Sequence, residues 1–158
     1  MSGGSSKDNV VISFHDVCLR ESDCSLLNGH YWLNDNIISF CFEYFRQIKY
    51  AINLKSSARF CFVSPDVVQL CKFSDLSTMR EIFRVLNQQN CELTFLPIND
   101  NESSVQSGGS HWSLLVYRET TKTFYHYDSM GEGTVNFHVA RQMCDTIYMS
   151  MMPVDSQK

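Results

Sequence analysis

The chain has 158 residues, of which 44% are hydrophobic, and it carries a formal net charge of −4. This length suits one globular domain, and the apolar content is sufficient for a buried core, so we expect a single domain. Clustered Lys and Arg, which a nucleic-acid-binding surface needs, do not occur in the sequence, and we therefore expect no nucleic-acid partner.

At the start of the chain, residues 1–9 are small and polar and lack the apolar core of a secretory signal. We expect residues 1–9 to form a flexible leader and residues 10–158 to form the domain. Apolar runs are far shorter than the about 20 residues that cross a bilayer, so we expect no membrane contact. The sequence predicts a soluble monomer in the cytoplasm or nucleus, with its seven cysteines reduced.

In the first half of the chain, residues 10–14 are predicted to form a strand, and residues 18–27 a connection with one helical turn around Asp23. A helix is predicted from Asn34, whose side chain can cap backbone N–H groups, to about Lys49. Its apolar residues recur at three- and four-residue spacing, so one face should pack on a core.

The middle of the chain contains another short strand at residues 60–63. Ser64 and Pro65 form a plausible helix start for residues 66–73, because Pro is favoured at the first helical position. A further helix is expected near residues 78–88.

Three strands follow at residues 92–98, 112–117 and 123–128, which indicates a mixed or antiparallel sheet. The polar stretch 99–110 has no apolar periodicity and is predicted to be a mobile surface loop. A last helix is expected at residues 134–149. The organisation is that of one α+β unit.

The ends of two adjacent predicted strands carry His111 and Asp128. Turn tips at Glu119 and Thr120 would place the pair directly opposite each other across a hairpin. Tips at Thr120 and Thr121 would place the pair diagonally on one face. The intermediate register would put the two side chains on opposite faces.

A histidine oriented by a carboxylate is what a general base requires, because the carboxylate fixes the tautomer and stabilises the imidazolium. The alternative is structural: His111 is a partly buried histidine satisfied by a neighbour, and Asp128 caps a turn before Ser129 and Gly131. Spacing alone leaves both interpretations open.

Three blocks of the sequence resemble, in family order, the signature blocks of the sentrin-specific protease family. They are WLNDNIISF at residues 32–40, GGSHWSLLVY at residues 108–117 and FYHYDS at residues 124–129. The tracts FEYF at residues 42–45 and INDN at residues 98–101, with the HYDS block, are most similar to the deneddylase branch.

The resemblance implies a papain-like α+β fold that cleaves after the C-terminal diglycine of a ubiquitin-like modifier. The modifier would be of the neddylation type, or otherwise SUMO, and its conjugates would be the partners. No metal and no cofactor are implied. By resemblance, His111 is the base and Asp128 its orienting residue.

The resemblance also assigns residues to the modifier's tail. Trp32 and Trp112 would roof a tunnel that admits only the diglycine, and Asp35 would meet the basic tail. Gly108 and Gly109 would be hinges of a loop that folds over the tail. The structural alternatives are a hydrophobic staple for Trp32, a core position for Trp112, a helix-start charge for Asp35 and an ordinary flexible loop.

The sequence departs from the family at the nucleophile, because the family's Gln and its Asp-Cys-Gly motif are both missing. Cys41, Cys61 and Cys91 lie in apolar elements, where burial should raise the thiol pKa, and Cys144 lies in a predicted helix. We therefore expect a chain truncated before the nucleophile, inactive and marginally stable alone. The alternative is a non-catalytic module that holds a ubiquitin-like modifier without cutting it.

Overall fold

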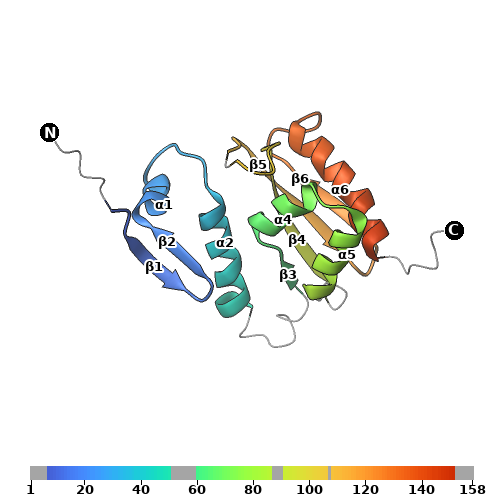
Figure 1. The fold of residues 1–158 in the computed structure, drawn as a ribbon, viewed down its shortest axis with the longest axis horizontal. Coiled ribbons are helices and arrows are strands. Elements are labelled where there is room, and N and C mark those ends of the chain that lie inside the picture. Colours follow the sequence, from blue (N-terminus) through green and yellow to red (C-terminus); the bar gives the residue numbers. More distant parts are fainter. Residues whose placement is uncertain (1–6, 51–59, 87–90, 107, 152–158) are drawn as a thin grey trace.

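The computed structural model describes residues 7–50, 60–86, 91–106 and 108–151. A small N-terminal unit lies beside a larger layered body (Figure 1). Strands β1 (Val10–Phe14) and β2 (Val17–Arg20) form an antiparallel hairpin in the small unit. The strand at residues 10–14 is confirmed, whereas β2 was expected to be part of a connection.

Two short helical turns and a longer helix complete the small unit. They are α1 (Glu21–Ser25), a 3₁₀ turn (Leu26–Asn28) and α2 (Asp35–Tyr44), which continues as a π-helical segment (Phe45–Lys49). The Asn34 side chain accepts a hydrogen bond from the Ile37 amide, so the predicted cap is confirmed.

The start of α2 is fixed by the buried carboxylate of Asp23. One of its oxygens accepts hydrogen bonds from the side-chain amides of Asn34 (2.6 Å) and Asn36 (3.1 Å), and the other from the Arg20 amide (2.8 Å). Burial alone would raise the pKa of Asp23, but these hydrogen bonds hold that pKa below its usual value. Asp23 therefore anchors the segment that carries Trp32 and Asp35.

The larger body is built on one four-stranded sheet. Its strands, in spatial order, are β3 (Phe60–Phe62), β4 (Leu93–Asn99), β5 (Trp112–Arg118) and β6 (Thr123–Tyr127). β3 is parallel to β4, and the other neighbours are antiparallel, so the sheet is mixed.

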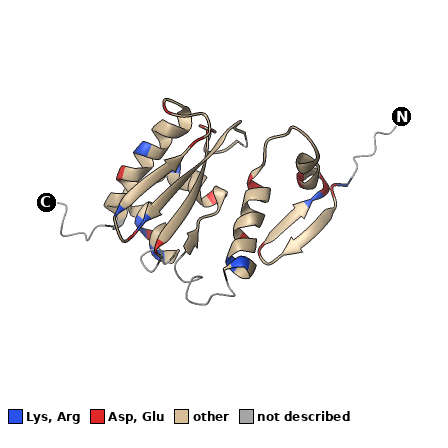
Figure 2. Cartoon of the chain, turned by 180° about the vertical axis from the view of Figure 1, so that it is seen from behind, with Lys and Arg blue, Asp and Glu red and all other residues tan. Residues whose placement is uncertain are grey.

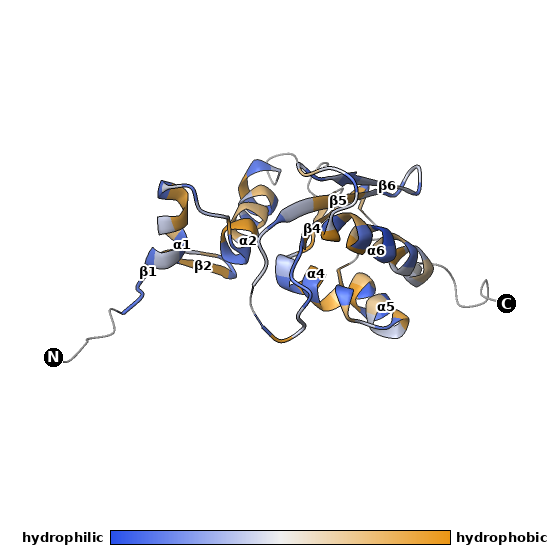
Figure 3. Ribbon diagram, turned by 90° about the horizontal axis from the view of Figure 1, so that it is seen from above, coloured by the Kyte–Doolittle hydropathy of each residue, from blue (hydrophilic) through white to orange (hydrophobic). Residues whose placement is uncertain are grey.

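Three helices cover one face of this sheet (Figure 3). They are α4 (Pro65–Lys72), α5 (Leu76–Val85) and α6 (Val135–Met151). Pro65 is the first residue of α4, as predicted, whereas α5 begins two residues early because Asp75 caps it through the Thr78 amide. The core between helices and sheet is continuous and includes Val68, Met79, Leu96, Leu115 and Ile147.

Aromatic side chains join the N-terminal unit to the other face of the sheet. Phe42 and Phe45 approach Phe62 of β3 at ring-centroid distances of 5.2 and 5.9 Å, and Phe62 stacks on Phe95 of β4 at 5.0 Å. The Arg46 guanidinium also donates to the Phe62 carbonyl oxygen. The helix thus packs on the sheet, but only partly through the expected face: the contacts come from Phe42, Phe45 and Arg46. Tyr44 and Ile48 of the expected apolar face are exposed, and Glu43, expected on the polar side, is buried.

The hydrogen bonds of Asp8 and Asn9 tie the end of the expected leader to the hairpin. Asp8 accepts from the amide and hydroxyl of Ser22, and the Asn9 carbonyl oxygen accepts from the Glu21 amide. Residues 1–6 of that leader lie outside the described residues. Among the helices that the structure describes, none has the length and apolar character to cross a membrane.

Candidate active site

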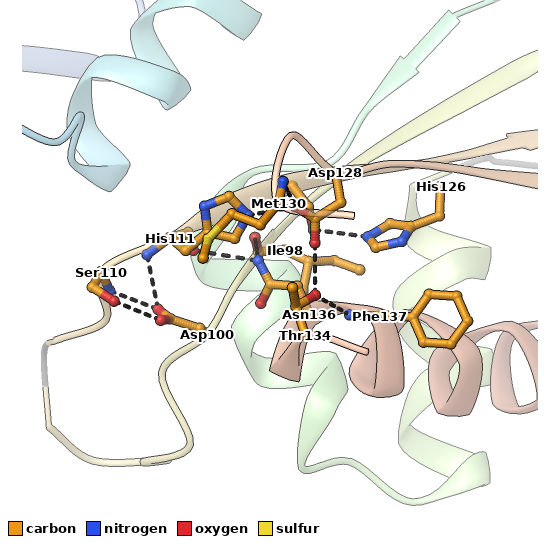
Figure 4. A network of polar contacts seen from close by, with 11 residues as sticks. Ile98, Asp100, Ser110, His111, His126, Asp128, Met130, Thr134, Asn136 and Phe137 are labelled. Carbon is orange, nitrogen blue, oxygen red and sulfur yellow. Dashed lines mark hydrogen bonds and ion pairs between the residues drawn. The ribbon is translucent and has the colours of Figure 1, made fainter. Parts of the chain in front are cut away.

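The register of β5 and β6 brings His111 and Asp128 together. Pairs from Leu114↔Tyr127 to Arg118↔Thr123 place Thr120 and Thr121 at the tip of the turn. This is the diagonal one of the two productive registers, and His111 Nε2 lies 2.6 Å from Asp128 Oδ1 (Figure 4).

The Asp128 side chain is only 4% exposed, and both of its carboxylate oxygens accept hydrogen bonds. Oδ1 also accepts from the Met130 amide at 2.9 Å, and Oδ2 accepts from the Thr134 hydroxyl at 2.8 Å. Burial by itself raises the pKa of Asp128, but these bonds and the one from His111 lower that pKa below its usual value. Asp128 therefore caps its turn and orients the histidine at once.

The ionised carboxylate decides the histidine tautomer. Because Asp128 can only accept, the proton of the neutral ring lies on Nε2, and Nδ1 keeps the lone pair that a general base needs. Within the described part of the chain, no group hydrogen-bonds to Nδ1. Nδ1 is thus the ring nitrogen of His111 that is available to accept a proton.

Thr134 connects the pair to α6. Its hydroxyl donates to Asp128 and accepts from the Phe137 amide at 3.2 Å, which caps the first turn of the helix. A helix beginning at Thr134 was predicted from the sequence, but the hydrogen bond from Thr134 to Asp128 could not be predicted from it.

A second histidine, His126, lies on β6 two residues before Asp128 and on the same face of the sheet. His126 Nε2 is 2.9 Å from the Ser113 hydroxyl, and its ring lies 6.3 Å from that of Phe137. Burial lowers the pKa of His126, and the charge of nearby Asp128 opposes this effect. The pKa of His126 is lowered overall, so its ring is less readily protonated than that of an ordinary histidine.

A groove with a volume of about 500 Å³ lies beside this pair, and the two neighbours of His111 in sequence line it. All five residues assigned to the modifier's tail line the same groove: Trp32, Asp35, Gly108, Gly109 and Trp112. The structure therefore brings together side chains from the start of α2, the loop 100–110 and the start of β5.

The two tryptophans take different positions at this groove. Trp32 is 69% exposed, which does not suit a hydrophobic staple. Trp112 is half-buried, and its indole nitrogen donates to the Leu33 carbonyl oxygen at 2.8 Å. This bond holds the segment before α2 against β5.

Asp35 at the start of α2 and Asp66 at the start of α4 both line the groove, and Figure 2 shows acidic residues in red at the starts of these two helices. Burial raises the pKa of Asp66, and the negative charge of Asp35 raises it further. A basic ligand at this point would relieve the repulsion between them.

Hydrogen bonds from α4 reach the start of the loop that follows β4, a loop that was expected to be mobile from its sequence. The Lys72 ammonium donates to the carbonyl oxygens of Asn99 and Asn101, and the Gln69 side chain donates to those of Asn101 and Ser103. The start of the loop is thereby anchored to the helix.

The two glycines of the loop are not equivalent. Gly109 has a φ of +94°, and a Cβ atom there would overlap the side-chain amide of Asn99. At Gly108 a Cβ would make only ordinary contact with Asn101, at 3.8 Å. Only Gly109 requires glycine for its backbone conformation and packing.

The thiol pKa values follow the expectation except at one position, but Cys41 was expected to be buried and is exposed. Partial burial still raises the pKa of Cys41, and a hydrogen bond with Cys91 together with burial raises that of Cys61. Cys91 is the exception, because the same hydrogen bond lowers its pKa. Burial raises the pKa of Cys144 to about 11. The described residues contain no cluster of three His, Cys, Asp or Glu that could hold a metal ion.

Comparison with known proteins gives a family. Residues 31–154 match the Ulp1 protease family, C-terminal catalytic domain. The chain is 44% identical to sentrin-specific protease 8 of Homo sapiens over 123 residues, which are 77% of this chain and 56% of that protein. It is 35% identical to NEDD8-specific protease 1 of Arabidopsis thaliana over 144 residues, 89% of this chain and 60% of that protein.

The chain spans little more than half the length of these relatives. The matched residues include the His111 and Asp128 pair, the groove and the whole four-stranded sheet. Since this match covers residues 31–154, the chain belongs to the Ulp1 protease family.

Proposed function

We propose that this chain supplies the base, its orienting carboxylate and the tail-binding groove of a cysteine protease that cleaves after the C-terminal diglycine of a ubiquitin-like modifier. The preferred modifier is of the neddylation type, and SUMO is the second candidate. The 2.6 Å contact between His111 and Asp128 beside the groove carries this proposal.

The geometry suits thiol chemistry in a direct way. Nδ1 of His111 takes the proton of the thiol, and the thiolate attacks the carbonyl carbon of the terminal glycine. Asp128 stabilises the imidazolium that forms, and the imidazolium then protonates the departing amine. Water activated by the same nitrogen hydrolyses the thioester and releases the modifier.

The groove supports the choice of substrate. Trp32 and Trp112 present flat rings that can close over glycine but would clash with a Cβ atom. Asp35 and Asp66 place negative charge where a basic tail would lie. Relatives named NEDD8-specific protease support the neddylation type over SUMO.

The nucleophile of this reaction is proposed to come from a segment with the family's Gln and Asp-Cys-Gly pattern, which the 158 residues do not contain. A hydrogen bond with Cys91 together with burial raises the pKa of Cys61, and burial raises the pKa of Cys71 and Cys144, so these thiols are poor nucleophiles. The Cys61 side chain is also inside the core.

We also propose that the protein acts as a monomer in the cytoplasm or nucleus, without nucleic acid or membrane as a partner. The cysteines in the described residues are free thiols, which supports a reducing compartment.

A chimaera tests the proposed function. The segment carrying Gln and Asp-Cys-Gly in a relative is joined to the C-terminus of this chain, and the product is incubated with a neddylation modifier that ends in a thiol-reactive electrophile. We expect an adduct on the introduced cysteine by intact mass, a weaker one with the SUMO probe, and none in the chimaera with His111→Ala.

Two other outcomes are informative. An adduct on the unextended chain would mean that one of its seven cysteines is the nucleophile, and the assignment above would be wrong. A chimaera that binds the modifier but forms no adduct would favour the non-catalytic binding module instead.

A further inference from the structure

The backbone of His111 is held by the side chain of Asp100, a residue with no role in the chemistry above. Asp100 Oδ1 accepts from the Ser110 amide at 2.6 Å and from the His111 amide at 3.0 Å, and Oδ2 accepts from the Ser110 hydroxyl at 2.8 Å (Figure 4). In return, the Asp100 amide donates to the His111 carbonyl oxygen at 3.2 Å.

These bonds add one irregular residue pair to the hydrogen-bond ladder between β4 and β5. The last regular pair is Asn99↔Trp112, so Asp100 and His111 are the next pair in register. Here the carboxylate of Asp100 takes the place of a backbone carbonyl as the acceptor for the His111 amide. The base is thus attached to the sheet through a side chain at the point where the strands separate.

The side-chain amide of a buried residue, Asn136, holds the backbone carbonyl group of His111. Asn136 of α6 is 0% exposed, and its Nδ2 donates to the carbonyl oxygens of Ile98 (3.2 Å) and His111 (3.4 Å). The His111 amide and carbonyl are therefore both bonded, one to Asp100 and the other to Asp100 and Asn136.

The carboxylate of Asp100 remains ionised in this position. Burial tends to raise the pKa of Asp100, but the bonds from the Ser110 amide and hydroxyl and from the His111 amide lower that pKa below its usual value. Charge-assisted bonds of this kind are stronger than those between neutral groups.

Asp100 also joins the two ends of the loop that lines the groove. The loop leaves the sheet at Asp100 and returns at Ser110, and Asn101, Gly108 and Gly109 between them line the groove. A ligand that moves this loop would act on the carboxylate that holds His111.

We propose that Asp100 is a positioning residue for the base, which sets the direction of the His111 ring and couples it to the groove loop. The catalytic importance of that direction rests on the proposed function, whereas the positioning itself does not. Small displacements of a reacting group are costly in catalysis, so a modest shift of this backbone would slow the chemical step more than binding.

The first test is nitrogen NMR of the His111 ring in the full 158-residue chain. We expect the wild type to show one protonated and one unprotonated ring nitrogen, with a single tautomer. Asp100→Asn removes the charge and leaves one acceptor for three donors, so we expect a mixture of tautomers or broadened ring signals. Asp100→Glu keeps the charge but moves the carboxylate, and we expect a smaller change in the same direction.

Asp75→Asn is the matched control, because Asp75 likewise accepts from an amide and a hydroxyl, those of Thr78 and Ser77, but caps α5 away from the groove. This variant should lower stability and leave the His111 ring signals unchanged. Wild-type ring signals in Asp100→Asn and Asp100→Glu would overturn the proposal. If Asp100→Asn does not fold, Asp100→Glu alone decides.

The second test uses kinetics of the chimaera on a modifier with a fluorogenic C-terminal amide. We expect Asp100→Asn to lower kcat about 10-fold and to change KM by a smaller factor, since the displaced base acts in the chemical step and the loop that Asp100 also holds contributes to binding. An unchanged kcat, or a change confined to KM, would contradict the positioning role. A chimaera with intact Asp100 that cleaves nothing would instead sink the proposed function and leave the ring spectra standing.

Discussion

The indole nitrogen of Trp112 donates a hydrogen bond of 2.8 Å to the carbonyl oxygen of Leu33, 79 residues earlier in the chain. This bond ties the segment that presents Trp32 to the strand that begins beside His111. The groove is therefore formed by two parts of the chain that must dock correctly on each other.

Trp112→Phe tests this docking. The ring remains apolar but loses its donor, so we expect unfolding stability to fall by about 1 kcal/mol, the ordinary net value of one hydrogen bond. Affinity for the neddylation modifier should fall further than stability, because Trp32 loses its fixed position. Urea unfolding and calorimetric titration measure the two effects. Equal affinity in the variant and the wild type would show that the bond does not shape the groove.

The glycine pair provides a prediction with a built-in control. Gly109→Ala forces a Cβ into the Asn99 amide at a positive φ, so we expect a stability loss of about 1–3 kcal/mol and weakened modifier binding. Gly108→Ala meets only ordinary contacts and should change stability by less than about 1 kcal/mol. Thermal unfolding of both variants decides the matter, and similar losses at the two positions would contradict the assigned geometry.

Asp128→Asn tests whether Asp128 orients the His111 ring, because the substitution keeps the shape of the side chain. The amide keeps the shape of the side chain but no longer fixes the proton on Nε2, so cleavage by the chimaera should fall about 10³-fold or more, as when a triad carboxylate is replaced by an amide. The rate is measured with a fluorogenic modifier substrate. Thr134→Val, which removes one of the donors to Asp128, should cause a much smaller loss. A rate within about twofold of wild type in Asp128→Asn would exclude Asp128 as the orienting residue.

We expect the free energy of unfolding to decrease as the pH is lowered into the acidic range. The pKa values of Asp23, Asp100 and Asp128 are each lower in the folded chain than usual, so unfolding takes up protons. Their contribution is fully present above the ordinary Asp pKa of about 3.9 and is lost as pH falls through the folded values.

Urea midpoints between pH 7 and pH 3 measure this loss. The decline below about pH 4 should be less steep in Asp23→Asn than in the wild type, because one of the coupled carboxyls is gone. A wild-type midpoint that stays constant down to pH 3 would contradict the lowered pKa values.

Much of the fold could be predicted from local patterns. The strand β1, the cap at Asn34, the Pro65 start of α4 and the three later strands follow from apolar spacing and from capping residues. The second strand of the hairpin was missed because residues 17–20 mix apolar and polar side chains in a run too short to show a period.

Some features of the candidate site could likewise be predicted from the sequence, and others could not. The distance between His111 and Asp128 followed from counting residues across a hairpin, up to the choice between two registers. Asp100 and Asn136 could not be identified, since their partners are backbone atoms that any residue supplies. Asp23 was missed as an anchor for a related reason: its bonds to Asn34 and Asn36 form only when α1 packs against α2.

The diagonal register has a practical consequence for changing the length of the chain. Side chains alternate between the two faces of a strand, so one residue inserted within β6 would carry Asp128 to the face away from His111. Residues inserted in the turn at 119–122 would not change the pairing of β5 with β6, because the paired residues end at Arg118 and Thr123. An epitope tag or a fluorescent reporter inserted there should leave the two side chains facing each other, which makes this turn the preferred attachment point on the larger body.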